Sequence, residues 1–227
     1  HMLDPLGLKG MTAAASDLAN AITAQARLAI VADYDCDGAT ACAVGLRGLS
    51  MLGASSIQTV VPDRSRDGYG LTPTIADRVK ALGADWLITV DNGIASVEGV
   101  AHAKRLGLKV LITDHHLPGD QLPQADHLIN PNQPGCTYAS KHLSGVGVMF
   151  MLLVATRAQL RQSHPDSAAA KARLDRLLPL VALGTVADLV KLDEHNRRLV
   201  HQGLQRIRAG QMPEGLKALF EVSGRDA

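Results

Sequence analysis

Three clusters of acidic residues and histidines each follow a short apolar run in this sequence. They are Asp33–Gly38 (DYDCDG), Asp91–Gly93 (DNG) and Thr113–His116 (TDHH). Carboxylate oxygens combined with one or two imidazoles suit Mn²⁺ or Mg²⁺, whereas zinc sites rich in thiolates look different. If the fold brings the clusters together, they can form one divalent metal site.

Asp33, Asp35 and Asp37 stand at alternate positions. Like charges this close raise each other's pKa or destabilise a fold unless a cation neutralises them. Two divalent metals about 3.5–4 Å apart can activate a bridging water and stabilise an in-line displacement at phosphorus. The pattern therefore predicts phosphoester hydrolysis. Cys36 alternates with the aspartates, so we expect it to point away from them into the packing.

Each cluster alone also has a simpler interpretation. Asp33–Asp37 could be a solvated loop or an isolated calcium loop, although the later EF-hand positions are absent. Asp91–Gly93 contains Asn-Gly, a common turn dipeptide. Asp188 could be a helix cap. Because the clusters recur at three predicted strand ends, the metal site is the better interpretation.

Alternating strand and helix patterns must position these side chains. The predicted strands are Arg27–Ala32, Ile57–Val61, Trp86–Val90, Leu108–Ile112 and His127–Ile129. This spacing predicts a doubly wound α/β fold with a mainly parallel five-stranded sheet and helices on both faces. In the strand order 2-1-3-4-5, a site lies at the carboxyl ends of the strands. That crevice would receive Asp35, Asp37, Asp91 and His115.

A helical C-terminal segment is predicted after residue 144. The predicted helices lie within 3–26 and at Ala39–Leu52, Ser96–Leu106, Ser144–Leu160, Asp166–Leu183, Glu194–Ala209 and Pro213–Val222, with a further one starting at Pro73. We expect Gly184–Asp188 to be a loop. Residues 1–2 are interpreted as a cloning scar, 3–190 as the catalytic domain, and 191–227 as a helical tail leading toward a second domain.

Two glycine-containing segments are candidates for binding phosphate. The loop 63–70 offers arginines as donors and glycines that allow close backbone approach. The turn 143–147 opens a helix whose free amides can hold an anion. An ordinary charged loop and a closely packed helix start are the simpler alternatives. The candidate substrate-binding residues are Arg64, Arg66, Tyr69, Ser144, Gly145 and Gly147.

Composition limits the function classes. The 227 residues are 46% hydrophobic and carry 23 basic against 22 acidic side chains, for a net charge of +1. A strongly basic nucleic-acid binder is excluded, and 3% aromatic residues are too few for an extended base-stacking platform. No signal peptide or membrane-spanning run is visible, and the three cysteines form no CxxC pair. A cytoplasmic protein with reduced thiols is expected.

In combination the motifs resemble the DHH phosphoesterases. The matching segments are Asp33–Gly38, Val61–Leu71, Thr89–Gly93 and Thr113–His116. Three later segments are similar to the RecJ branch of this family: Asn130–Cys136, Leu143–Gly147 and Ala182–Asp188. Members of that branch are single-strand-specific 5′→3′ DNA exonucleases of repair and recombination. Asp33 also supports this branch, because the oligoribonuclease and cyclic-dinucleotide branches usually have histidine there. The resemblance covers about residues 27–210.

The resemblance implies a site for two Mn²⁺ or Mg²⁺ ions. One ion would be held by Asp33, Asp35 and Asp91, and the other by Asp37, Asp91, His115 and Asp188. Asp91 would bridge the ions and His116 would lie near the scissile phosphate, whereas Asp114 is expected to orient the loop or an imidazole. The products would be 5′-mononucleotides.

The family continues into further nucleic-acid-binding domains. We therefore expect an excised core that is weaker and less processive than a full-length enzyme. A single-strand-binding protein or a helicase would be a partner through those regions. Two alternatives stay open: a DHH enzyme for oligonucleotides, cyclic dinucleotides or polyphosphate, and a non-catalytic DHH scaffold.

Overall fold

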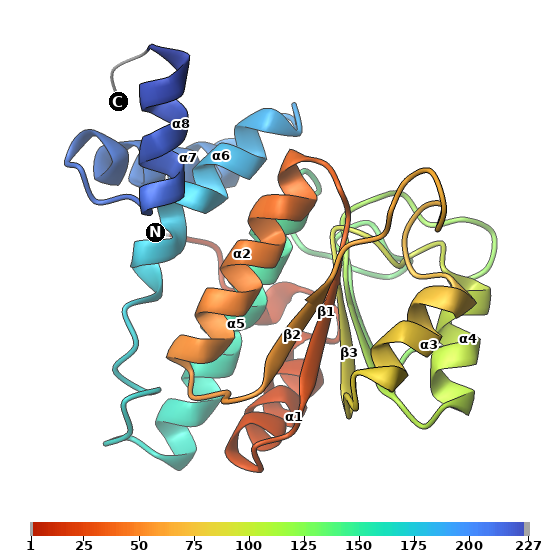
Figure 1. Ribbon diagram of the computed structural model, residues 1–227. Helices are drawn as coiled ribbons and strands as arrows, with labels where there is room; N and C mark the ends of the chain where they lie inside the picture. The colour runs from red at the N-terminus through yellow and green to blue at the C-terminus, as the bar shows by residue number, and fades with distance from the viewer. Residues whose placement is uncertain (1, 225–227) are drawn as a thin grey trace.

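A computed structural model describes residues 2–224. Its centre is one five-stranded, all-parallel sheet in the order β2-β1-β3-β4-β5, which confirms the predicted order (Figure 1). The strands are β1 (Leu28–Ala32), β2 (Ile57–Val60), β3 (Trp86–Val90), β4 (Lys109–Thr113) and β5 (His127–Ile129). Each lies within one residue of its predicted bounds.

Helices cover both faces of the sheet (Figure 1). One face carries α1 (Met11–Thr23), α2 (Cys36–Met51) and α5 (Gly145–Ser163); the other carries α3 (Pro73–Ala81) and α4 (Val97–Arg105). Successive residues of β1 face the two cores in turn: Ile30 packs on the α2 side and Val31 on the α3 side. Burial on both faces explains why the strands are apolar throughout.

The C-terminal segment is helical, with α6 (Leu178–Ala187), α7 (Glu194–Arg208) and α8 (Glu214–Ser223). Short 3₁₀ turns lie at η1 (Pro5–Gly7) and η2 (Leu174–Leu177). The prediction of one helix over Asp166–Leu183 is wrong, because Pro179 starts α6 in its first turn and cannot sit in a helix interior. Within residues 2–224 we find no helix that combines the length and apolar character needed to cross a membrane.

The predicted loop at Gly184 is also wrong, since Gly184 lies inside α6. A Cβ there would stand 2.1 Å from Oγ1 of Thr40 and 2.9 Å from Oδ1 of Asp37. The glycine therefore serves close approach of α6 to α2. This contact brings the end of α6 to the carboxyl edge of the sheet.

Candidate metal centre

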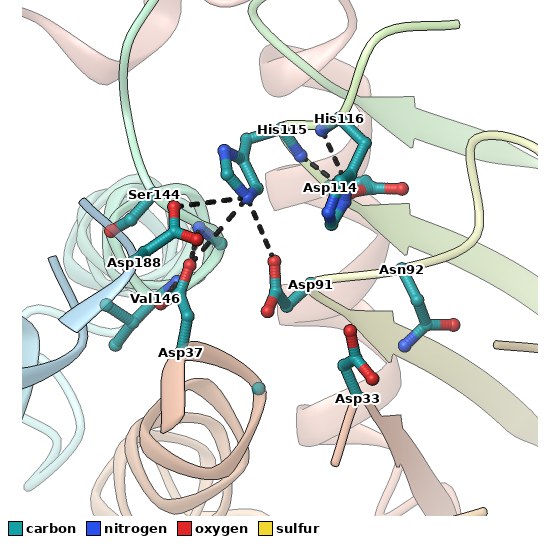
Figure 2. Close-up of polar contacts among 12 residues, drawn as sticks. Asp33, Asp37, Asp91, Asn92, Asp114, His115, His116, Ser144, Val146 and Asp188 are labelled. Carbon is teal, nitrogen blue, oxygen red and sulfur yellow. Dashed lines mark hydrogen bonds and ion pairs between the residues drawn. The ribbon is translucent and has the colours of Figure 1, made fainter. Parts of the chain in front are cut away.

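The acidic clusters meet at the carboxyl edge of the sheet (Figure 2). The amide of Asp33, just beyond β1, donates to the carbonyl of Val90 in β3. The amide of Asp91, just beyond β3, donates to that of Thr113 in β4. The strand ladder thus continues into the clusters and holds them side by side.

Three carboxylates surround the imidazole of His115. Its Nε2 lies 3.1 Å from Oδ1 of Asp91, 3.5 Å from Oδ2 of Asp188 and 3.8 Å from Oδ2 of Asp37. Although these distances are short, Asp91 Oδ1, His115 Nε2 and Asp188 Oδ2 are buried atoms without a properly oriented hydrogen bond among the described residues. Buried polar atoms are normally satisfied. This convergence of unsatisfied ligand atoms fits a divalent cation.

The structure groups candidate ligands in three sets. Within each, atoms able to bind a metal lie within 4.8 Å of one another: the sets are Asp33, Asp35 and Asp91; Asp37, His115 and Asp188; and Asp91, His115 and His116. The third set joins the other two, because it contains both Asp91 and His115. Their roles as ligands stay predictions, but their juxtaposition is as expected.

Asp91 occupies the centre of the cluster in a strained backbone conformation. Its φ is +61°, a left-handed value that aspartate tolerates better than most residues. Its side chain is buried. Burial, and then the charge of Asp35, raises the pKa of Asp91 to about 9. A cation at the site would reverse this effect by favouring the carboxylate.

Asp37 is fixed by the first turn of α5. Its two oxygens accept hydrogen bonds from the amides of Gly145 (2.6 Å) and Val146 (2.9 Å). Burial, and then the charge of Asp91, raises the pKa of Asp37 to about 7. The amide of Gly147 donates to Oγ of Ser144, the N-cap of α5. These amides therefore hold protein oxygens, which corrects the prediction that they bind phosphate.

Gly145 is the residue that permits this arrangement. A Cβ at position 145 would lie 2.4 Å from Oδ1 of Asp91. Any side chain there would displace either α5 or the central carboxylate. A closely packed helix start is the simpler alternative for this turn, and the structure shows that the packing is against the site itself.

Asp114 and His116 form a hydrogen-bonded pair at the side of the cluster. Oδ1 of Asp114 lies 2.7 Å from Nδ1 of His116, and Oδ2 accepts from the amide of Ile94. Burial alone would raise the pKa of Asp114, but these hydrogen bonds outweigh it and lower the pKa. The bond to Asp114 raises the pKa of His116 to about 9, which favours its cationic form. Asp114 thus orients an imidazole, as expected.

Two asparagines hold the histidine loop through its backbone. The side-chain amide of Asn130 donates to the carbonyl of His116 (2.9 Å), and that of Asn132 donates to the carbonyl of His115 (2.6 Å). Sequence reasoning did not assign these residues to the site. Their segment was recognised only as a similarity motif, and nothing in its local pattern shows that it reaches the histidine loop.

Only part of the loop 63–70 lies against the metal cluster, and its role in binding substrate stays a prediction. Burial and the charge of Asp33 raise the pKa of Tyr69, and its ring lies 6.2 Å from that of His116. Arg64 lies over the ring of Tyr34. Arg66 instead faces Asp63 of its own loop at 3.9 Å, with 84% of its side chain exposed. Arg66 is therefore not drawn into the cluster.

The sequence of residues 27–185 matches the family described as DHH family, N-terminal domain. The chain belongs to the DHH family. It is 51% identical over 221 residues to the single-stranded-DNA-specific exonuclease RecJ of Salmonella typhimurium, covering 96% of this chain and 38% of that protein. RecJ of Escherichia coli is 50% identical over 222 residues, which cover 97% of this chain and 38% of that protein. The chain thus spans well under half the length of these relatives.

Solved structures agree with this assignment. A crystal structure of exonuclease RecJ bound to manganese superposes with a TM-score of 0.83 and 34% identity, over 98% of this chain and 54% of that one. RecJ of Thermus thermophilus in complex with Mg²⁺ gives a TM-score of 0.62 and 28% identity, over 96% of this chain and 26% of that one. The DHH match ends at residue 185, so Asp188 lies just beyond it.

Proposed function

We propose that this DHH domain is the two-metal phosphodiesterase core of an exonuclease. It degrades single-stranded DNA from the 5′ end and releases 5′-mononucleotides. The observation that carries the proposal is the convergence of unsatisfied atoms from Asp91, His115 and Asp188. The similarity to proteins named as single-stranded-DNA-specific exonucleases supports the substrate class.

Two divalent cations, Mn²⁺ or Mg²⁺, would occupy the cluster. One would bind Asp33, Asp35 and Asp91; the other would bind Asp37, Asp91, His115 and Asp188. When bound, such ions supply a nucleophilic hydroxide and stabilise charge at the phosphorus. The support for Mn²⁺ and Mg²⁺ comes from the carboxylate-rich donor set and from the metals named for the related structures.

The substrate phosphate would bind on the side of the cluster that carries His116. The cationic form of His116 attracts phosphate, and Asp114 fixes its ring. Beside it lies a cavity of about 850 Å³, lined by Tyr69, Ser96, His116 and Leu117 among others. Arg64 and Tyr69 approach from the loop next to Asp33. The cavity gives room for a nucleotide next to the reacting phosphate.

A substrate panel tests the proposal. Oligonucleotides labelled at the 5′ or the 3′ end, single-stranded or in duplex, are incubated with Mn²⁺ or Mg²⁺, together with a cyclic dinucleotide and polyphosphate. We expect labelled mononucleotide from the 5′-labelled single strand at the earliest times, and no such product from the Asp91→Asn variant. Preference for the small substrates would establish the small-substrate alternative. Inactivity on every substrate with metal bound would establish the scaffold alternative.

Three further expectations stay predictions. A single-strand-binding protein or a helicase remains a predicted partner. The cytoplasmic location remains an expectation from the sequence. Lower processivity than a full-length relative is checked by comparing product lengths from both proteins in single-encounter digestions.

A further inference from the structure

Tyr34 lies between two proposed metal ligands but has no assigned role. Its backbone amide donates to Oδ1 of Asp33 at 2.7 Å, so its position is tied to the metal cluster. The ring is half-buried and extends toward the loop 63–70. Tyr34 therefore links the metal-binding strand end to the substrate-side loop.

A continuous row of ring contacts runs across the mouth of the site. The guanidinium carbon of Arg64 lies 5.6 Å from the centroid of the Tyr34 ring. The Tyr34 and Tyr69 rings meet edge to face at 6.1 Å and 87°. Tyr69 in turn meets His116 edge to face at 6.2 Å and 85°. Both geometries are favourable cation–π and aromatic arrangements.

Apart from these ring contacts, the loop 63–70 has few contacts with the side of the protein that carries the metal cluster. Arg64 and Tyr69 are exposed, with half of the Tyr69 side chain accessible. At its far side Asp67 accepts a hydrogen bond from Arg78 of α3 at 2.6 Å. The remaining loop bonds of Asp63, to Ser65 and Asp67, are internal. On the metal side, the ring contacts of Tyr34 with Arg64 and Tyr69, and that of Tyr69 with His116, fix the loop.

We propose that Tyr34 is a positioning residue whose ring holds Arg64 and Tyr69 over the metal centre beside His116. This inference rests on the proposed function, because it assigns the loop to the phosphate of the substrate strand. Arg64 is stacked on a ring, so less of its side-chain entropy is lost when it binds phosphate. The role belongs to the ring, since we find no hydrogen bond of the Tyr34 hydroxyl within residues 2–224.

Kinetics on a 5′-phosphorylated single strand with Mn²⁺ test this role. Tyr34→Leu is expected to raise KM about tenfold, because one ring contact and one cation–π contact are lost. The value of kcat should change less than about threefold. Tyr34→Phe keeps the ring and is expected to retain the wild-type KM. If Tyr34 acts through Arg64, Tyr34→Leu adds less than about twofold to KM in an Arg64→Gln background. Equal KM values for Tyr34→Leu and wild type, or equal damage from Phe and Leu, would overturn the proposal.

Limited trypsin digestion gives a readout that does not need activity. Arg64 and Arg66 are cleavage sites in the loop. Tyr34→Leu is expected to speed cleavage there by about tenfold, because loops that lose anchoring contacts open more often, while Tyr34→Phe cleaves like wild type. Unchanged cleavage in Tyr34→Leu refutes the inference even if the protein is inactive on DNA. If the wild type is inactive on single-stranded DNA but trypsin still cleaves Tyr34→Leu faster than wild type, the proposed substrate is refuted. The role of Tyr34 in holding the loop is then still supported.

Discussion

Nε2 of His115 lies 3.1 Å from Oδ1 of Asp91, and no hydrogen bond of acceptable geometry joins the two atoms. His115 comes from the end of β4 and Asp91 from the end of β3, so the sheet itself sets this separation. Both atoms are buried and unsatisfied, as is Oδ2 of Asp188. A fold rarely keeps three such atoms together unless a ligand satisfies them.

Asp91→Asn is expected to separate fold stability from metal binding. In the metal-free protein the buried carboxyl of Asp91 must take up a proton at neutral pH, and asparagine avoids this cost, so the metal-free variant should gain about 1–2 kcal/mol in free energy of unfolding. The variant should lose the rise in melting temperature that Mn²⁺ gives the wild type, and at least about a thousandfold in hydrolysis. Thermal scans after chelation and with added Mn²⁺ measure the first two effects. Asp120→Asn, on an exposed residue, is the matched control. A full Mn²⁺ response in Asp91→Asn would contradict the site.

The two histidines should behave differently. His115 faces three carboxylates, whereas His116 is held by Asp114. His115→Gln is expected to weaken Mn²⁺ binding more than about 100-fold, and His116→Gln by less than about tenfold while still lowering kcat. Calorimetric Mn²⁺ titration and single-strand hydrolysis compare the two variants. Equal losses of affinity would show that His116 also ligates the metal.

The parts of the site that depend on sheet topology could be predicted from the sequence. Parallel strands in the order 2-1-3-4-5 bring the residues after strands one, three and four to one edge, and Asp33, Asp91 and His115 lie there. The periodicity of apolar residues and the lengths of the apolar runs are local features of the sequence, and they are enough to predict the strands and their ends. No long-range contact had to be known.

The parts that depend on helix packing could not be predicted in this way. Gly145 and Val146 bind Asp37 across more than a hundred residues of sequence, and only the packing of α5 on α2 brings them together. The prediction for Cys36 was wrong for a local reason. The prediction assumed that side chains alternate between two faces, which holds in a strand. However, α2 begins at Cys36, and the thiol of Cys36 is exposed.

Gly145→Ala should damage the site without removing any polar group. The added Cβ would stand 2.4 Å from Oδ1 of Asp91, so α5 must shift or the carboxylate must turn. We expect a loss of about 1–3 kcal/mol in stability, typical of overpacking, together with weaker Mn²⁺ binding. Gly215→Ala is the control, because a Cβ there meets nothing within 4 Å in α8. Equal Mn²⁺ affinity in both variants would show that α5 does not need to approach Asp91 so closely.

A histidine far from the metal centre should control stability in mild acid. His195 on α7 is 3% exposed, its Nδ1 accepts from the amide of Leu3 at 3.2 Å, and its Nε2 is unsatisfied. Burial lowers the pKa of His195, an effect that the charge of Asp193 only partly offsets. The folded state therefore keeps the imidazole neutral at pH values where the unfolded chain, with a pKa of about 6.5, already binds a proton. Because the unfolded state then holds more protons at this residue, the contribution of His195 to the free energy of unfolding falls as pH drops below about 6.5, by up to about 1.4 kcal/mol per pH unit until the folded pKa is reached. The raised pKa values of Asp37 and Asp91 act in the opposite direction, so the effect of His195 is read as the difference between variant and wild type. Urea unfolding of the metal-free protein at pH values above and below about 6.5 measures this slope. Relative to wild type, His195→Gln should gain stability as the pH falls, while the exposed control His201→Gln should keep the wild-type dependence on pH. An unchanged slope in His195→Gln would assign the acid sensitivity to other groups.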